Sequence, residues 1–252
     1  MDSEKIELVS SDEDKISISS SNFDKIRNEQ LESIIERREG SKMLKLPYPK
    51  EVVALVVNYL RTNNPQLKSL NDSFQLYDLS KKYSIDDLCR ECENYIKVRL
   101  NMKTVCAIYD FACRMNHAYL RHFCWEIFDA HCPEIFEGED FKSCGTTTIH
   151  RIVSRPLYTR MSEVDIFLAV YSWIEEKCKR EMGTSFVQMD ENAKKQKYRE
   201  ELQPFLENIR FLAMNKQELI NKIFKLNLFT KEEKKSILVC KETKIFQISR
   251  VI

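Results

Sequence analysis

Glycine and proline are scarce in this chain, whose 252 residues include only 4 glycines and 6 prolines. Tight turns depend on these two residues, so the counts disfavour an all-β sandwich or barrel, which needs many such turns. They also leave no glycine-rich loop for binding a phosphate or a dinucleotide. Long apolar runs are missing as well: no stretch approaches the roughly 18 consecutive apolar residues of a membrane-spanning helix. We therefore predict no association with a membrane.

An excess of charge of one sign is also absent. Lysine and arginine together number 40 and aspartate and glutamate 39, which gives a formal net charge of +1. Proteins that bind nucleic acids in general show a basic excess or a basic stripe, so no nucleic-acid partner is predicted. A secretory signal has a basic flank followed by an apolar run, and the first residues of this chain show no such pattern. With 43% apolar and 31% charged residues, the composition is that of an ordinary globular protein.

The nine cysteines are an odd number and are scattered through apolar-periodic segments. Without a secretory signal, this pattern predicts reduced, buried thiols in a cytoplasmic or nuclear protein. Cys89 and Cys92 form a Cys-x-x-Cys pair, but a structural zinc site usually needs two such pairs and no second one occurs. We therefore predict buried core thiols here, with a metal or redox role as the alternative. No metal and no cofactor is predicted.

The sequence offers only weak candidates for a catalytic site. His117 and His150 each have a cysteine nearby in sequence, but a Cys/His nucleophile also needs an accessible electropositive pocket, which no pattern indicates. The acidic run Asp12–Asp14 is explained by a solvated turn. No nucleophile elbow and no His-Glu-x-x-His is present. The sequence therefore predicts a non-enzymatic interaction protein without catalytic residues, and a zinc- or thiol-dependent enzyme is the alternative from another class.

The N-terminal third alternates between strand and helix patterns. Residues 6–9 and 15–19 each alternate apolar and polar side chains around an Asp/Ser turn, which predicts a β-hairpin. The apolar residues between 23 and 35 follow at helical spacing and predict two short helices. Residues 43–46, just before Pro47, predict a third short strand.

From Lys50 onward the apolar residues recur at helical spacing almost without interruption. Ser162 and Asp165 form a capping box that opens a long helix. The polar segment Glu181–Lys197 is predicted to be a mobile loop, and residues 244–249 alternate in the manner of a strand. The pattern predicts an α+β module followed by an all-α region.

The order of elements in the first hundred residues resembles a BTB/POZ domain. The segments that carry this resemblance are Ile6–Val9, Ile16–Ile18, Leu31–Ile35, Leu44–Tyr48, Val56–Thr62, Leu76–Tyr83 and Leu88–Ile96. The following region resembles the BACK domain that accompanies BTB domains. Its matching segments are Asn101, Val105, Ile108–Ala112, Leu120, Ile152–Leu157, Ser162–Val170, Trp173–Ile174 and Leu206–Phe211.

Together the two resemblances cover nearly the whole chain. They imply an α+β BTB/POZ-like module over residues 1–100 and an all-α BACK-like helical domain over 101–212. A C-terminal helical extension that ends in a short strand would then occupy 213–252. The hairpin begins at Ile6, so the helix and strand that BTB dimers exchange are expected to be missing, as in the short cullin adaptors Skp and elongin C. The resemblance thus makes self-association doubtful, allows a partner BTB protein, and predicts that the strand over residues 6–9 is an unpaired edge.

The resemblance further implies an adaptor or substrate receptor of a cullin-3-type RING ubiquitin ligase, with an unknown substrate protein as second partner. The alternative is a BTB scaffold or transcription-associated oligomerisation protein that binds no cullin. The family's cullin contact often includes an apolar-x-Glu motif, which Ile34-Ile35-Glu36 matches. The predicted cullin-binding face combines a loop with exposed positions on the following helices, and consists of Ile35, Glu36, Tyr59, Tyr77 and Tyr83. A second interpretation places these tyrosines in the core.

Overall fold

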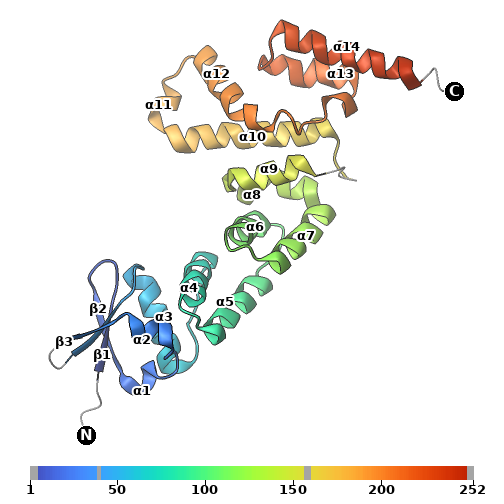
Figure 1. The fold of residues 1–252 in the computed structure, drawn as a ribbon. Helices are drawn as coiled ribbons and strands as arrows, with labels where there is room; N and C mark the ends of the chain where they lie inside the picture. Colours follow the sequence, from blue (N-terminus) through green and yellow to red (C-terminus); the bar gives the residue numbers. More distant parts are fainter. Residues whose placement is uncertain (1–4, 39–40, 156–159, 249–252) are drawn as a thin grey trace. The chain divides into compact units, whose positions relative to one another are not determined.

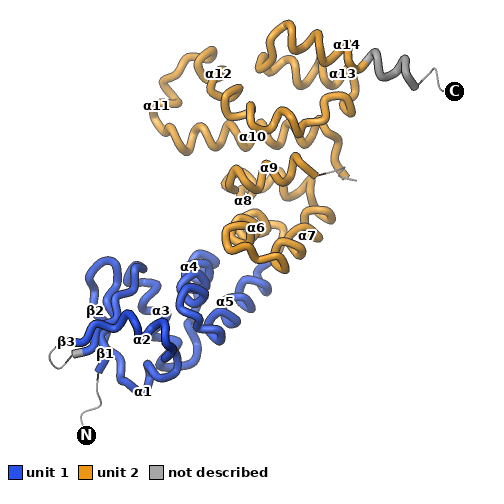
Figure 2. The backbone as a smooth tube through the Cα atoms, viewed as in Figure 1, with its two compact units in different colours: residues 1–100 blue, residues 101–252 orange. Residues whose placement is uncertain are grey.

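The computed structural model describes residues 5–38, 41–155 and 160–248 (Figure 1). The chain divides into two compact units, an N-terminal unit over Met1–Leu100 and a C-terminal unit over Asn101–Ile252 (Figure 2). The N-terminal unit combines a small mixed sheet with helices, and the described part of the C-terminal unit contains helices and no strands. This confirms the predicted fold class, an α+β module followed by an all-α region.

The N-terminal unit contains a four-stranded sheet with the order β2-β1-β4-β3. Its strands are β1 (Lys5–Val9), β2 (Lys15–Ser19), β3 (Ile35–Arg38) and β4 (Ser41–Lys45). The hairpin of β1 and β2 is confirmed, with Ile6 opposite Ile18. However, β1 also pairs in parallel with β4, so the prediction that residues 6–9 form an unpaired edge was wrong. Strands β2 and β3 are the edges of this sheet.

Strand β3 replaces part of the helix that the sequence predicted up to residue 35. Helix α1 (Ser20–Phe23) and helix α2 (Glu29–Ser33) form as expected, but the helical stretch stops at Ile34. The next residues pair antiparallel with β4, with Ile35 opposite Leu44. A short run such as Ile34-Ile35 suits a helix and a strand equally well, so only pairing with a partner strand decides between them.

Three helices of similar length complete the N-terminal unit: α3 (Lys50–Thr62), α4 (Leu70–Lys82) and α5 (Asp86–Val98). Pro49 precedes α3, and Asn63 ends it in the left-handed conformation at φ +58°. Ser69 opens α4 through a capping box with Asp72. The core lies between the sheet and these helices, and its buried members include Ile6, Leu8, Leu44, Val53, Leu60, Leu76 and Leu88.

The described part of the C-terminal unit consists of α-helices of very different lengths and of short helical turns. The helices are α6 (Val105–Arg114), α7 (Ala118–Glu137), α8 (Glu139–Ser143), α9 (Thr146–Ser154), α10 (Glu163–Met182), α11 (Thr184–Val187), α12 (Glu191–Leu202), α13 (Lys216–Glu218) and α14 (Lys231–Ile248). Between them lie the short turns η1 (Gln203–Phe205), η2 (Phe211–Ala213), η3 (Leu219–Ile223) and η4 (Phe224–Leu226). The predicted capping box of Ser162 and Asp165 opens α10.

Two regions of the C-terminal unit differ from the sequence prediction. The segment Glu181–Lys197, predicted to be a loop, contains the end of α10, all of α11 and the first part of α12. Its polar run forms a helix because Asp190 caps α12 and Tyr198 and Leu202 anchor its far end in the core. The strand predicted over residues 244–249 was also wrong, since α14 continues to Ile248. Residue 249, the last of the predicted strand, lies outside the described residues. Alternation over six residues is too short to distinguish the strand period from the helical one.

Two half-buried carboxylates connect the helices around α6. The Asp140 side chain accepts hydrogen bonds from the backbone N–H groups of Cys106 at 2.7 Å and Ala107 at 3.2 Å, and so caps the start of α6 from α8. In return, the Asp110 side chain on α6 accepts a bond from the Gly145 N–H at 2.6 Å and one from the Thr148 hydroxyl, at the start of α9. A Cβ atom on Gly145 would lie 3.1 Å from an Asp110 carboxylate oxygen. Glycine therefore permits this close approach, which fixes α9 against α6.

In the described part of the chain, no helix has both the length and the apolar character that crossing a bilayer requires.

Candidate functional site

Ile35 and Glu36 lie side by side on the edge strand β3 and not in a loop, as the sequence predicted. The Ile35 side chain is half-buried, and its backbone pairs with Leu44. A Glu36 carboxylate oxygen lies 2.9 Å from the Lys45 ammonium nitrogen on the neighbouring strand. The ion pair is largely exposed, so it contributes little to stability, and the carboxylate remains close to solvent.

Ile34 is the apolar residue in this segment that the prediction passed over. It caps the end of α2 just before β3, and 39% of its surface is exposed. The signal was in the sequence: in the apolar-x-Glu motif, Ile34 occupies the apolar position and Ile35 the middle one. The structure therefore presents Ile34 to solvent beside Glu36.

The three predicted tyrosines separate into one at the surface and two in the core. Tyr59 on α3 is half-buried and lines a polar hollow of about 720 Å³ with residues of α5. Tyr77 and Tyr83 are only 3% and 5% exposed, so the prediction that they are exposed was wrong. The Tyr77 hydroxyl donates a hydrogen bond to Glu93 at 3.4 Å, and burial raises its pKa. Both tyrosines lie in the core, where removal of their ring surface from water stabilises the fold.

The Cys-x-x-Cys pair lies on the inner face of α5. Cys89 and Cys92 are both buried, and burial raises the pKa of each thiol. Thiolates are the form that binds metals and attacks electrophiles, so these environments suit core packing. Within residues 5–38, 41–155 and 160–248, no three His, Cys, Asp or Glu side chains gather closely enough to hold a metal ion.

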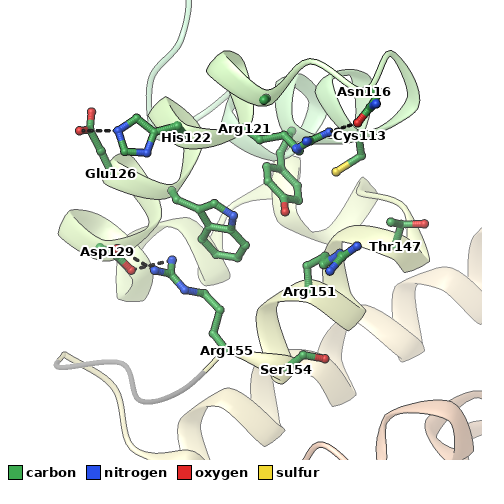
Figure 3. A pocket seen from close by; sticks show the side chains of 13 residues that line it. Cys113, Asn116, Arg121, His122, Glu126, Asp129, Thr147, Arg151, Ser154 and Arg155 are labelled. Carbon is green, nitrogen blue, oxygen red and sulfur yellow. Dashed lines mark hydrogen bonds and ion pairs between the residues drawn. The ribbon is translucent and has the colours of Figure 1, made fainter.

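The C-terminal unit contains a groove of about 870 Å³ that no sequence motif indicated (Figure 3). Helices α6, α7 and α9 form its walls. Its lining residues are Tyr109, Cys113, Asn116, Ala118, Arg121, His122, Trp125, Glu126, Asp129, Thr147, Arg151, Ser154 and Arg155. We call this feature the α6-α7-α9 groove.

Aromatic rings form the base of this groove. The Tyr109 and Trp125 rings meet edge to face with centroids 5.1 Å apart, and Trp125 also packs against Phe128 at 5.0 Å. The Arg155 guanidinium stacks over the Trp125 ring at 4.0 Å. Tyr109 is buried, which raises the pKa of its hydroxyl. The base is thus apolar and rigid, while the rim is charged.

The C-terminal unit matches a known domain family. The family model of the BACK domain, "BTB And C-terminal Kelch", matches residues 105–224. BTB/POZ domain-containing protein 6 of Xenopus tropicalis is 26% identical over 185 residues, which cover 73% of this chain and 33% of that protein. Human BTB/POZ domain-containing protein 3 is 28% identical over 102 residues, 40% of this chain and 19% of that protein.

The chain therefore spans about a third or less of the length of these curated relatives. The relatives carry BTB/POZ in their names, and the BACK match begins at Val105, shortly after the N-terminal unit ends. The N-terminal unit has the mixed sheet and paired helices expected of a BTB module, and the BACK match lies within the helical unit. The BACK match, the BTB/POZ relatives and the fold together support a BTB-BACK family protein.

Proposed function

We propose that this protein is a non-enzymatic adaptor that binds a cullin-3-type scaffold through its N-terminal unit and brings a substrate protein to a RING ubiquitin ligase. Family membership supports the broader role of a protein-interaction adaptor. The cullin contact is the specific part of the proposal. It would take place in the cytoplasm or nucleus, where reduced thiols such as those of this chain are stable.

The observation that supports the proposal is the exposure of Ile34, which is 39% exposed at the end of α2. Two residues further along the chain, on the edge strand β3, lies the Glu36 carboxylate, which is close to solvent. An apolar anchor that enters a pocket, with a charged group at the rim, is the usual arrangement of an interaction hot spot. Tyr59 would add a half-buried ring on the separate surface of α3 and α5.

The binding free energy expected of the Ile34 side chain is large enough to be measured with a single substitution. Complete burial of one large aliphatic anchor at a hot spot is typically worth about 2 kcal/mol or more. Replacing Ile34 by aspartate would remove this contribution and place a charge in an apolar pocket. Because Ile34 is exposed in the free protein, the same change costs little folding free energy.

The experiment is capture of purified cullin-3 by the full chain, with the melting temperature measured in parallel. We expect Ile34→Asp to weaken capture at least about thirtyfold, the factor that ~2 kcal/mol implies, and to leave the melting temperature nearly unchanged. Ile35→Asp should weaken capture and lower the melting temperature, because Ile35 is half-buried on β3. Val187→Asp on α11 is the matched control, since Val187 is exposed and lies in the other unit. Full capture by a folded Ile34→Asp variant would refute the contact.

The second candidate is a scaffold or transcription-associated oligomeriser that binds another BTB chain and no cullin. The exposed edges β2 and β3 favour it, because an edge strand can pair with a strand of another molecule. Sedimentation of the purified chain, alone and with a second BTB protein, tests this candidate. Tight association that survives the Ile34→Asp change would support pairing through β2, and the absence of any association would reject the candidate.

A further inference from the structure

The α6-α7-α9 groove combines an aromatic base with a surplus of positive charge. Three arginines line it, Arg121 from α7 and Arg151 and Arg155 from the end of α9, against two carboxylates, Glu126 and Asp129 of α7. Figure 3 shows Arg121 on one wall and Arg151 on the opposite one, with the two carboxylates toward the side of the hollow.

Both carboxylates already have partners within the groove. Asp129 holds Arg155 with two contacts, at 2.8 Å to Nη1 and 3.0 Å to Nη2. Glu126 lies 3.5 Å from the His122 Nε2 atom. Planar arginine–carboxylate pairs of this kind are strong and fix the geometry of both side chains. Asp129 is thus neutralised by Arg155, whereas the contact of Glu126 with His122 is an ion pair only when the imidazole is protonated.

Arg121 and Arg151 remain without a carboxylate partner. The Arg121 guanidinium donates to the neutral amide oxygen of Asn116 at 3.0 Å, which positions it but does not neutralise it. Arg151 is exposed, and among the residues that the structure describes no acidic side chain pairs with it. Two cations thus face an open hollow above the Trp125 ring, and a hollow of this size admits a short stretch of polypeptide.

We propose that the α6-α7-α9 groove binds a short acidic peptide segment of a partner protein. Two carboxylates of the segment pair with Arg121 and Arg151, and one apolar side chain between them packs on the exposed part of Trp125. The arginine guanidinium matches a carboxylate through two parallel N–H donors, so the match is geometric as well as electrostatic. The inference deepens the proposed adaptor function, because it names a class of partner for the helical unit, and it rests on that function.

The charge distribution favours a peptide over a nucleic acid. A nucleic-acid surface must be basic over several phosphates, whereas this chain has a net charge of only +1 and the groove holds two carboxylates. A peptide presents isolated charges separated by neutral residues, which the spacing of Arg121 and Arg151 across an apolar base accommodates.

The test begins with selection of random short peptides, displayed on phage, against the immobilised full chain. We expect the selected peptides to be rich in aspartate and glutamate with an aromatic or large aliphatic residue among them. Their affinity is then measured by fluorescence polarisation. Arg151→Glu should weaken binding by about tenfold or more, and Arg121→Gln with Arg151→Gln should do the same without introducing negative charge.

Lys235→Glu is the matched control, because Lys235 is exposed on α14 and the change reverses the same charge away from the groove. Affinity should be unchanged in this variant. Selected peptides without an acidic excess, or equal weakening by Lys235→Glu and Arg151→Glu, would overturn the proposal. Tighter binding of an oligonucleotide than of the acidic peptides would overturn it in favour of a nucleic acid. Because no cullin is present, the result is independent of cullin capture, which Arg151→Glu should leave intact.

Discussion

The largest fully buried side chains differ in kind between the two units of the protein. In the N-terminal unit the largest fully buried residues are aliphatic, with Phe23 as the exception; they include Ile6, Leu8, Leu31, Leu44 and Leu60. In the C-terminal unit they are aromatic, namely Phe111, Phe128, Phe141, Phe167, Trp173 and Phe205. A small sheet with short helices leaves narrow gaps that branched side chains fill, whereas helices that cross one another leave wider spaces that rings fill.

The ion pairs of the two units differ in their exposure to solvent. In the N-terminal unit the pair Glu36–Lys45 is exposed on both sides. In the C-terminal unit Glu201 lies 2.6 Å from Lys177 and 2.7 Å from Lys197, and its side chain is only 18% exposed. The helical unit thus contains larger buried side chains and an ion-pair cluster that is less exposed than the Glu36–Lys45 pair. Substitutions at these points should therefore cost it more stability than comparable substitutions cost the N-terminal unit.

The largest effect is expected from Trp173→Ala in the C-terminal unit. The ring is buried, and its Nε1–H donates a hydrogen bond to the Cys144 carbonyl at 2.9 Å. Removal of the ring should lower the free energy of unfolding by about 3–5 kcal/mol, from lost burial and the cavity that remains. Urea unfolding followed by circular dichroism measures this loss. Trp173→Phe is the control: it retains a ring and should lose roughly 1–3 kcal/mol, mainly because the carbonyl is left unpaired.

Leu88→Ala is the corresponding change in the N-terminal unit and should cost less than Trp173→Ala. Leu88 is fully buried on α5, so loss of its side chain should lower the free energy of unfolding by about 2–5 kcal/mol. Val98→Ala on the same helix should change stability by less than about 0.5 kcal/mol, since Val98 is 82% exposed. A loss well below 1 kcal/mol for Leu88→Ala would contradict its place in the core, and a loss above that of Trp173→Ala would reverse the comparison between the units.

The smallest effect concerns the ion pairs and depends on pH. Burial raises the pKa of Glu201, but hydrogen bonds and ion pairs with Lys177 and Lys197 outweigh it, so the pKa lies below its ordinary value of 4.5. A lowered pKa in the folded state means that the carboxylate stabilises the fold fully above pH 4.5 and that this contribution is lost as the pH falls through the folded value. Glu201→Gln should therefore lower stability by up to about 1 kcal/mol at neutral pH.

The difference between the wild type and Glu201→Gln should shrink in melting experiments below pH 4.5. Glu36→Gln, which alters the exposed pair of the N-terminal unit, serves as the reference and should change stability by a few tenths of a kcal/mol at most. An equal loss in both variants would show that the ion pairs of the two units do not differ. A difference for Glu201→Gln that grew at low pH would show the opposite sign of the pKa shift.

Much of the fold followed from local patterns. The alternation of residues 6–9 and 15–19 predicted the first hairpin, and Ser162 with Asp165 predicted the start of α10. These signals are local, because a strand's alternation and a helix cap each involve only neighbouring residues. The same locality explains the errors. The stretches at 34–35 and 244–249 suited both periods, and no sequence pattern could supply the partner strand that made β3 or the continuation of α14.

The candidate surfaces were predictable to a smaller extent. The apolar-x-Glu pattern drew attention to residues 34–36, but the structure shows that Ile34 is more exposed than the predicted Ile35 and that Tyr77 and Tyr83 lie in the core. No local sequence pattern predicted the α6-α7-α9 groove. Its residues come from three helices and run from Tyr109 to Arg155, and charged residues on a helix are usually explained by simple solvation.

The class of the fold and the positions of most helices could be predicted from local patterns, because hydrophobic period, caps and the scarcity of glycine act within a few residues of the chain. The central place of β1, the caps that Asp140 and Asp110 each provide to a helix more than thirty positions away, and the shared hollow of Arg121 and Arg151 became visible in the folded structure alone. These features depend on which elements meet in space. The free energies of burial and of strand pairing determine which elements meet. They act between segments that are remote in sequence, so no local sequence pattern predicts them.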